Sequence, residues 1–199
     1  SLKKSIHDFE SALKYAVFTE KNWQLYDNIG SAKKTLGDFA GARAAFDSSI
    51  VLTRTNYYSL LNRGVIYLNY DANNLNANNA VEKEKYLKLS ILDFDNALRL
   101  TTSNTDRVNL YNNIGIAKFF LGDFAGALNY ADSAIAVDAG NAQSYILKGN
   151  ARFSLGDYEA AFEDFNKATE INPQDANAIK GRDAVKSILE SEKKQSGKR

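Results

Sequence analysis

Residues 111–127 read YNNIGIAKFFLGDFAGA, and residues 26–42 read YDNIGSAKKTLGDFAGA. Thirteen of these seventeen positions are identical. A weaker third copy, YILKGNARFSLGDYEAA, occupies residues 145–161. The chain therefore contains internal repeats, and the repeated unit decides its fold.

The repeat has a period of 34 residues, which separates Gly30 from Gly64 and Gly115 from Gly149. Each copy begins with small and apolar residues at helical spacing, followed by a Leu-Gly-Asp-aromatic turn. The glycine suits the left-handed position just past a helix end, and the aspartate can cap the next helix. Each repeat is thus predicted to be an antiparallel helix pair that buries its apolar face only when stacked on its neighbours.

This pattern resembles the tetratricopeptide repeat, with its aromatic, Leu-Gly, aromatic, Ala, Phe/Tyr, Ala and Pro positions. The best-matching copy spans 142–175 and carries the signature at Tyr145, Gly149, Gly156, Asp157, Tyr158, Ala161, Phe165, Ala168 and Pro173. The resemblance implies an all-α fold, a TPR-type α-solenoid in which antiparallel helix pairs form a right-handed superhelix. It also implies a non-catalytic scaffold for protein–protein interaction.

The repeat register divides the whole chain. The predicted segments, in chain order, are 1–22 (second helix of a truncated repeat), 23–56, 57–104 (with a 14-residue insertion), 108–141, 142–175, a capping helix at 176–190 and a basic tail at 191–199. Within the insertion, residues 81–100 are expected to be helical, and residues 71–80 remain open between an irregular approach and a projecting contact element.

A longer duplication is also visible. Residues 2–42 and 87–127 align without gaps at an offset of 85, with 22 of 41 positions identical. Helix 2–18 then corresponds to the second helix of repeat 57–104, and its own first helix would precede residue 1. Together with the absence of methionine, this predicts the C-terminal part of a longer array. Ile6, Phe9 and Leu13 are expected to be exposed or buried against another molecule, for example by self-association through this half-repeat.

Composition excludes several function classes. The net charge of +1 argues against nucleic acid as the main partner, and no apolar run approaches the ~20 residues needed to span a bilayer. The chain has no cysteine, and His7 is its single histidine, so no metal site, cofactor or catalytic constellation is expected. The sequence does not choose between the cytoplasm and an exported location.

In this family the first helix of each repeat lines a concave groove, and the resemblance places a set of residues there. The candidates for binding a peptide or helix are Tyr58, Leu61, Val65, Asn109, Asn112, Ile116, Phe119, Phe120, Gln143, Ile146, Asn150 and Phe153. Amide groups can pair with a peptide backbone, and aromatic groups can anchor it. Alternatively, Phe119 and Phe153 pack against a neighbouring helix, or the chain is a structural, self-assembling module of a larger complex.

Two rows of polar residues bear on the partner. Lys33, Lys118 and Arg152 share one repeat position and form either a basic stripe or side chains whose stems cover apolar surface. Family members that grip acidic chaperone tails do so with a clamp of lysine, asparagine and arginine. Here Asp27, Asn109 and Asn113 stand at three of its cationic positions, so no carboxylate clamp is expected.

Overall fold

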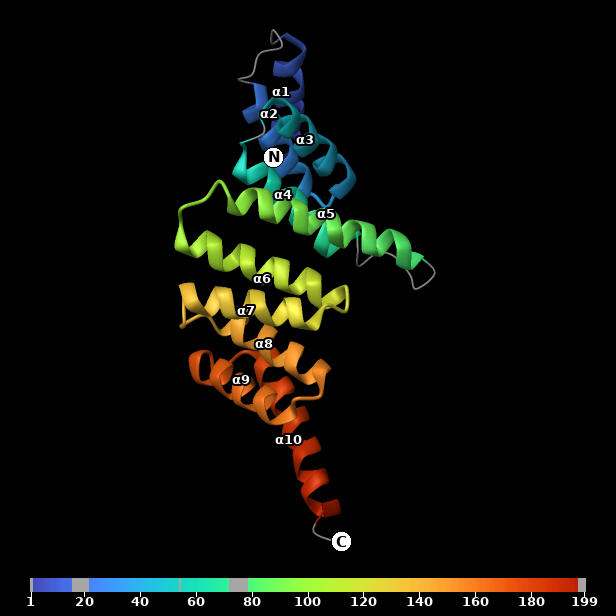
Figure 1. Cartoon of the computed structure of the whole chain (residues 1–199). Helices are drawn as coiled ribbons and strands as arrows, with labels where there is room; N and C mark the ends of the chain where they lie inside the picture. Colours follow the sequence, from blue (N-terminus) through green and yellow to red (C-terminus); the bar gives the residue numbers. More distant parts are fainter. Residues whose placement is uncertain (1, 16–21, 54, 72–78, 197–199) are drawn as a thin grey trace. The chain divides into compact units, whose positions relative to one another are not determined.

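The computed structural model describes residues 2–15, 22–53, 55–71 and 79–196, and it divides into two compact units, residues 1–101 and 102–199. All regular elements within the described residues are helices, as the repeat pattern predicts (Figure 1). The fold is an all-α helical-repeat solenoid.

Unit 1 contains five α-helices within the described residues. They are α1 (Leu2–Tyr15), α2 (Trp23–Thr35), α3 (Phe39–Leu52), α4 (Tyr57–Ile66) and α5 (Ala80–Leu98). A π-helical turn, η2 (Tyr67–Asp71), extends α4. Each helix packs on the next along the chain. The open segment 71–80 lies mostly outside the described residues.

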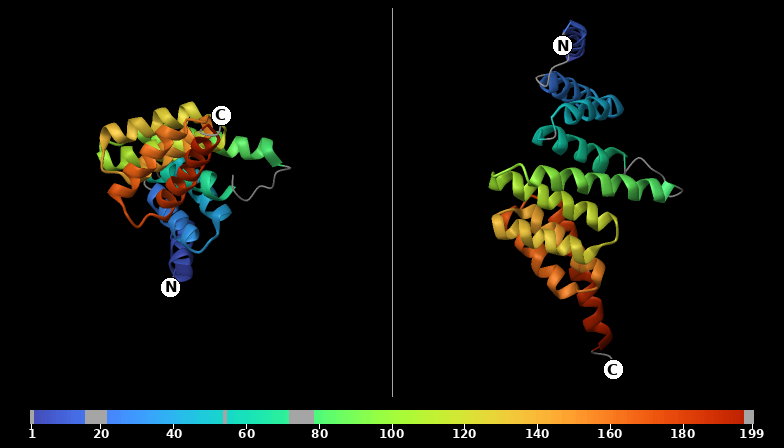
Figure 2. Two further views of the ribbon diagram at one scale, coloured as in Figure 1. Left: turned by 90° about the horizontal axis from the view of Figure 1, so that it is seen from below. Right: turned by 45° about the horizontal axis from the view of Figure 1, so that its top comes forward.

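Unit 2 contains α6 (Asn104–Phe120), α7 (Phe124–Val137), α8 (Ala142–Leu155), α9 (Tyr158–Ile171) and α10 (Ala176–Ser196). Within each of the hairpins α6–α7 and α8–α9, a short turn joins the two helices, as two further views show (Figure 2). The last helix, α10, continues past the predicted end at residue 190, and it packs on both α8 and α9.

The turn between the paired helices has the predicted chemistry. Gly37, Gly122 and Gly156 have φ of 80°, 78° and 82°, the left-handed region that glycine enters without strain. After the first of them, Asp38 Oδ1 accepts from the Gly41 amide at 2.9 Å and caps α3. Asp123 and Asp157 cap α7 and α9 in the same way.

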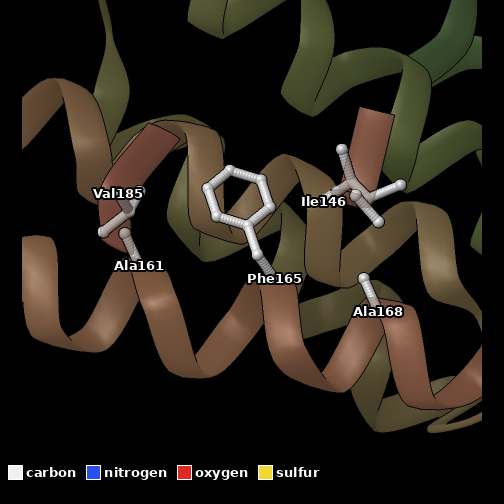
Figure 3. Close-up of a cluster of buried hydrophobic side chains, with 6 residues drawn as sticks. Ile146, Ala161, Phe165, Ala168 and Val185 are labelled. Atoms are coloured by element: carbon white, nitrogen blue, oxygen red, sulfur yellow. The ribbon is translucent and has the colours of Figure 1, made fainter. Parts of the chain in front are cut away.

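Close approach of the helix pairs α2–α3, α4–α5 and α8–α9 depends on a glycine in the first helix and a phenylalanine in the second. A Cβ on Gly64 would lie 2.7 Å from Phe94 Cε1, so only glycine leaves room for this ring. In unit 2 the ring of Phe165 lies among Ile146, Ala161, Ala168 and Val185 (Figure 3). These residues come from α8, α9 and α10, so α10 completes the apolar core of the last repeat.

Candidate functional site

The first helices of the repeats carry the predicted groove residues, and most of these side chains reach the surface. Six are exposed: Tyr58, Asn109, Phe120, Gln143, Asn150 and Phe153. Four are half-buried: Leu61, Val65, Ile116 and Phe119. The helices α6 and α8, which carry most of these residues, contact each other within unit 2.

Two predicted groove residues are enclosed instead. Ile146 is buried because α10 packs against α8, and Ala178 and Val185 of α10 share its apolar cluster. Asn112 is buried because its Nδ2 donates to Asn141 Oδ1, 3.2 Å away at the start of α8. Neither side chain is available to a ligand on the surface.

The three phenylalanines of the predicted groove differ in role. Phe119 packs against the cluster of Ala127, Leu147 and Ala151, and its ring centroid lies 5.3 Å from that of Phe124. It therefore belongs to the core that joins α6, α7 and α8.

By contrast, Phe120 is 47% exposed and Phe153 is 39% exposed. The ring of Phe120 contacts that of Phe119 edge-on with centroids 6.0 Å apart, and the ring of Phe153 contacts that of Tyr158 with centroids 5.5 Å apart. Both rings are therefore exposed apolar groups on the first helices of unit 2.

Each cation of the predicted basic row is engaged within the chain. Lys33 pairs with Glu10 at 3.1 Å, Lys118 with Asp123 at 2.8 Å and Arg152 with Asp164 at 3.0 Å. A basic stripe for an acidic partner would have to give up these internal ion pairs.

A cation immediately before the helix-packing glycine joins α4 to both flanking second helices. Arg63 donates from Nε and Nη2 to Asp93 of α5, and from Nη1 to Asp47 of α3 at 2.7 Å. Burial raises the pKa of Asp93, and the hydrogen bonds from Arg63 oppose that rise. The pKa of Arg63 is raised by these carboxylates although burial opposes it.

The same junction recurs 85 residues later, between α7, α8 and α9. Lys148, the equivalent of Arg63, pairs with Asp132 at 2.8 Å. On the other side, Arg152 pairs with Asp164, and burial raises the pKa of Asp164 to about 6. Arg63 and Lys148 each stand immediately before a helix-packing glycine, Gly64 and Gly149. Asp47 and Asp132 stand 16 residues before Arg63 and Lys148, and this shared offset was the sequence signal for the pairing.

A second recurring network ties each first helix to the start of the next one. Asn56, the N-cap of α4, donates from Nδ2 to Asp27 Oδ2 at 2.7 Å, and Ser59 Oγ donates to Asp27 Oδ1. Asn112 and Asn141 are the equivalents in unit 2. Asp27 therefore holds the N-cap of the next helix.

A groove of about 730 Å³ opens in unit 1 between α3, α4 and α5. Its rim carries exposed Val51, Leu92 and Leu100, and Arg63 with its two carboxylates forms part of the lining. In the described ranges, no group of three or more His, Asp or Glu side chains is placed to hold a metal ion. None of the described helices is long and apolar enough to cross a membrane.

Comparison with known proteins agrees with this geometry. The tetratricopeptide-repeat family model matches residues 112–176. The TPR repeat-containing protein MJ1428 of Methanocaldococcus jannaschii is 29% identical over 188 residues, which cover 90% of this chain. The chain spans only 28% of the length of that relative.

Solved structures show the same fold. A tetratricopeptide repeat protein of Parabacteroides merdae superposes with a TM-score of 0.75 at 16% identity, over 94% of this chain and 67% of that one. YrrB, described as a TPR protein with an unusual peptide-binding site, superposes with a TM-score of 0.65 at 19% identity, over 92% and 84%. Residues 112–176 therefore belong to the tetratricopeptide-repeat family, and the chain as a whole is similar to proteins of this family, whose fold is a module for protein–protein interaction and generally a non-catalytic scaffold.

Proposed function

We propose that the first-helix surface of unit 2 binds a peptide segment of another polypeptide, either extended or helical. The observation that carries this proposal is the pair of exposed rings, Phe120 on α6 and Phe153 on α8, on two helices that contact each other. Exposed apolar groups gathered on one face are typical of interaction sites. Rings of this size, once covered, supply most of the affinity of such sites.

The amides around the two rings suit a peptide backbone. Asn109, Gln143 and Asn150 are exposed, and none of them has a side-chain hydrogen bond to another described residue. Each amide can donate and accept, so together they can match the alternating donors and acceptors of a peptide main chain. The similarity to YrrB, a peptide-binding TPR protein, supports the same use of the fold.

Charge indicates a peptide that does not depend on a terminal carboxylate. The cations of this surface, Lys118 and Arg152, already pair with Asp123 and Asp164. The aromatic and amide groups would therefore dominate recognition, and a neutral or apolar segment fits them best.

The test is a selection of binders from a random peptide library, followed by affinity measurement with two double variants. Phe120→Ser with Phe153→Ser removes both rings and leaves the core residue Phe119 in place. The control, Leu36→Ser with Leu155→Ser, removes two similarly exposed apolar groups that precede the turn glycines. We expect the ring variant to lose about tenfold or more in affinity, and the control to lose little. Equal binding by all three proteins would rule out this surface.

A further inference from the structure

Helix α1 repeats the sequence of α5 but not its surroundings. At the offset of 85, Ser5, Asp8, Phe9 and Ala12 of α1 correspond to Ser90, Asp93, Phe94 and Ala97 of α5. All four residues of α5 are buried, with exposed fractions of 0 to 1%. In α1 the serine and phenylalanine are half-buried, and the aspartate and alanine are exposed.

The difference arises on one face of the helix. α4 packs on α5 and covers Asp93 and Phe94, because Gly64 lies over Phe94 and Arg63 binds Asp93. α1 packs on α2, with Glu10 paired to Lys33. No described residue covers Asp8 or Ala12, while Ile6 and Phe9 are partly covered. The side chain of Leu13 lies outside the described residues.

The helix pairs α4–α5 and α8–α9 show which residues pack against a face that carries aspartate and phenylalanine. The first helices α4 and α8 carry a cation before the packing glycine, in Arg63-Gly64 and Lys148-Gly149. Their partner helices α5 and α9 carry aspartate followed by phenylalanine, at Asp93-Phe94 and Asp164-Phe165. Basic-glycine and aspartate-phenylalanine thus occur together, and a cation of the first helix compensates the buried carboxylate in both pairs. Arg63 binds Asp93 directly, whereas Asp164 is bound by Arg152 and is also attracted by Lys148.

The other two helix pairs give the contrast. In α2 and α6 the residue before the packing glycine is Ile29 or Ile114. The residues of α3 and α7 that stand where α5 has Asp93 are Ala45 and Tyr130. An aspartate in the second helix therefore goes with a cation in the first helix throughout the four complete repeats. The Asp8-Phe9 pair of α1 matches the second helices α5 and α9, whose first helices carry a cation.

We infer that the exposed face of α1 is a docking site for an amphipathic helix that carries arginine or lysine immediately before glycine. The cation binds the carboxylate of Asp8, and the glycine lies over the ring of Phe9, as Arg63 and Gly64 do on α5. The partner is a helix that is not among the described helices of this chain. This site lies in unit 1 and does not depend on the peptide surface proposed for unit 2.

The test supplies such a helix in register. Residue 86 corresponds to residue 1, so a second copy of residues 56–85 joined directly to Ser1 would place a copy of α4 ahead of α1 with natural spacing. The matched control is the same graft with its copy of Arg63 changed to Glu and its copy of Gly64 changed to Leu. Amide hydrogen exchange of residues 2–12 is then compared between the two grafted chains, with Asp8→Asn introduced into each.

We expect the native graft to slow exchange in α1 about tenfold or more relative to the control graft. Asp8→Asn should reverse much of that protection in the native graft and little in the control. Equal exchange in the two grafts, or an effect of Asp8→Asn that is the same in both, would overturn the inference. Peptide binding by unit 2 should be unchanged in every chain, so failure here is separate from failure of the proposed function.

Discussion

The guanidinium of Arg63 grips the carboxylate of Asp93 side-on, with Nε donating to Oδ2 at 2.8 Å and Nη2 to Oδ1 at 2.6 Å. Asp93 is 1% exposed, so this is a buried pair rather than a surface one. The third donor of Arg63, Nη1, reaches Asp47 of α3. One side chain of α4 therefore ties together the second helices on both of its sides.

Arg63→Leu is expected to destabilise unit 1 strongly, although it replaces a charged side chain with an apolar one. The substitution leaves Asp93 buried without a partner, which typically costs about 3 to 5 kcal/mol of the free energy of unfolding. Urea denaturation followed by circular dichroism would measure the change.

Two further variants separate the charge from the packing. Arg63→Leu combined with Asp93→Leu should recover much of the loss, because no unpaired charge then remains buried. Lys88→Leu, which removes an exposed pair with Glu84, should change stability by less than about 1 kcal/mol. If the single Arg63 variant were as mild as the Lys88 variant, the buried pair would not be a structural tie.

Gly64→Ala is expected to destabilise the α4–α5 pair, although alanine is the better helix former by about 1 kcal/mol. The new Cβ would lie 2.7 Å from Phe94 Cε1, and overpacking of this kind typically costs about 1 to 3 kcal/mol. In a Phe94→Leu background the same change should cost less or become stabilising. The two chains are compared by thermal denaturation, and an equal cost in both backgrounds would contradict the steric explanation.

The sequence predicted the fold well because the repeat signature consists of local rules. Glycine at a positive φ and aspartate at an N-cap each recur at a fixed position of the repeat, and the structure confirms both. The groove was harder to predict, because the exposure of a side chain on a first helix depends on which other helix packs against it. Ile146 occupies a groove position of the family, yet α10 covers it.

Asn112 shows the same limit in another form. Its place on α6 suggests contact with a ligand, but the N-cap residue of α8 reaches back and binds it. Such pairing between helices follows from the distance of two side chains in space, which a single sequence does not contain. The duplication at offset 85 was the clue, since Asp27 and Asn56 stand in the same relation.

Stability of unit 2 should depend on pH through Asp164. Burial raises the pKa of this carboxyl to about 6, against the attraction of Arg152 and Lys148, whereas an aspartate in an unfolded chain titrates near ~3.9. Between these two pH values the folded state binds more protons than the unfolded state. The contribution of Asp164 to stability therefore rises as the pH falls from about 7 to about 4.

The comparison that isolates this contribution is the wild type against Asp164→Asn, unfolded with urea at a series of pH values. The difference in free energy of unfolding should shift in favour of the wild type by up to about 3 kcal/mol between pH 7 and pH 4. A carbon-detected titration of the Asp164 carboxyl provides the direct check. A difference that is flat with pH, or that shifts the other way, would show that the carboxyl titrates normally.

Asn56→Ala should destabilise the protein more than Asn141→Ala, although both asparagines are N-caps at equivalent positions. Asn56 Oδ1 accepts from two backbone amides, and its Nδ2 donates to the carboxylate of Asp27 and to Ser49 Oγ at 2.9 Å. Asn141 caps α8 by accepting a hydrogen bond from the Ser144 amide, and it accepts a second one from the neutral side-chain amide of Asn112. The Oδ1 atom of Asn112 has no hydrogen-bond partner among the described residues.

The physical reason for this difference is the charge of Asp27. Loss of a cap alone costs about 1 kcal/mol, and both variants incur that cost. Asn56→Ala additionally breaks a charge-assisted bond and leaves part of a half-buried carboxylate unsatisfied, which adds about 1.5 to 3 kcal/mol. Chemical denaturation of the two single variants measures the difference between their free energies of unfolding. In an Asp27→Asn background, the difference in unfolding free energy between the two variants should become smaller. If that difference is unchanged, Asp27 is not its cause.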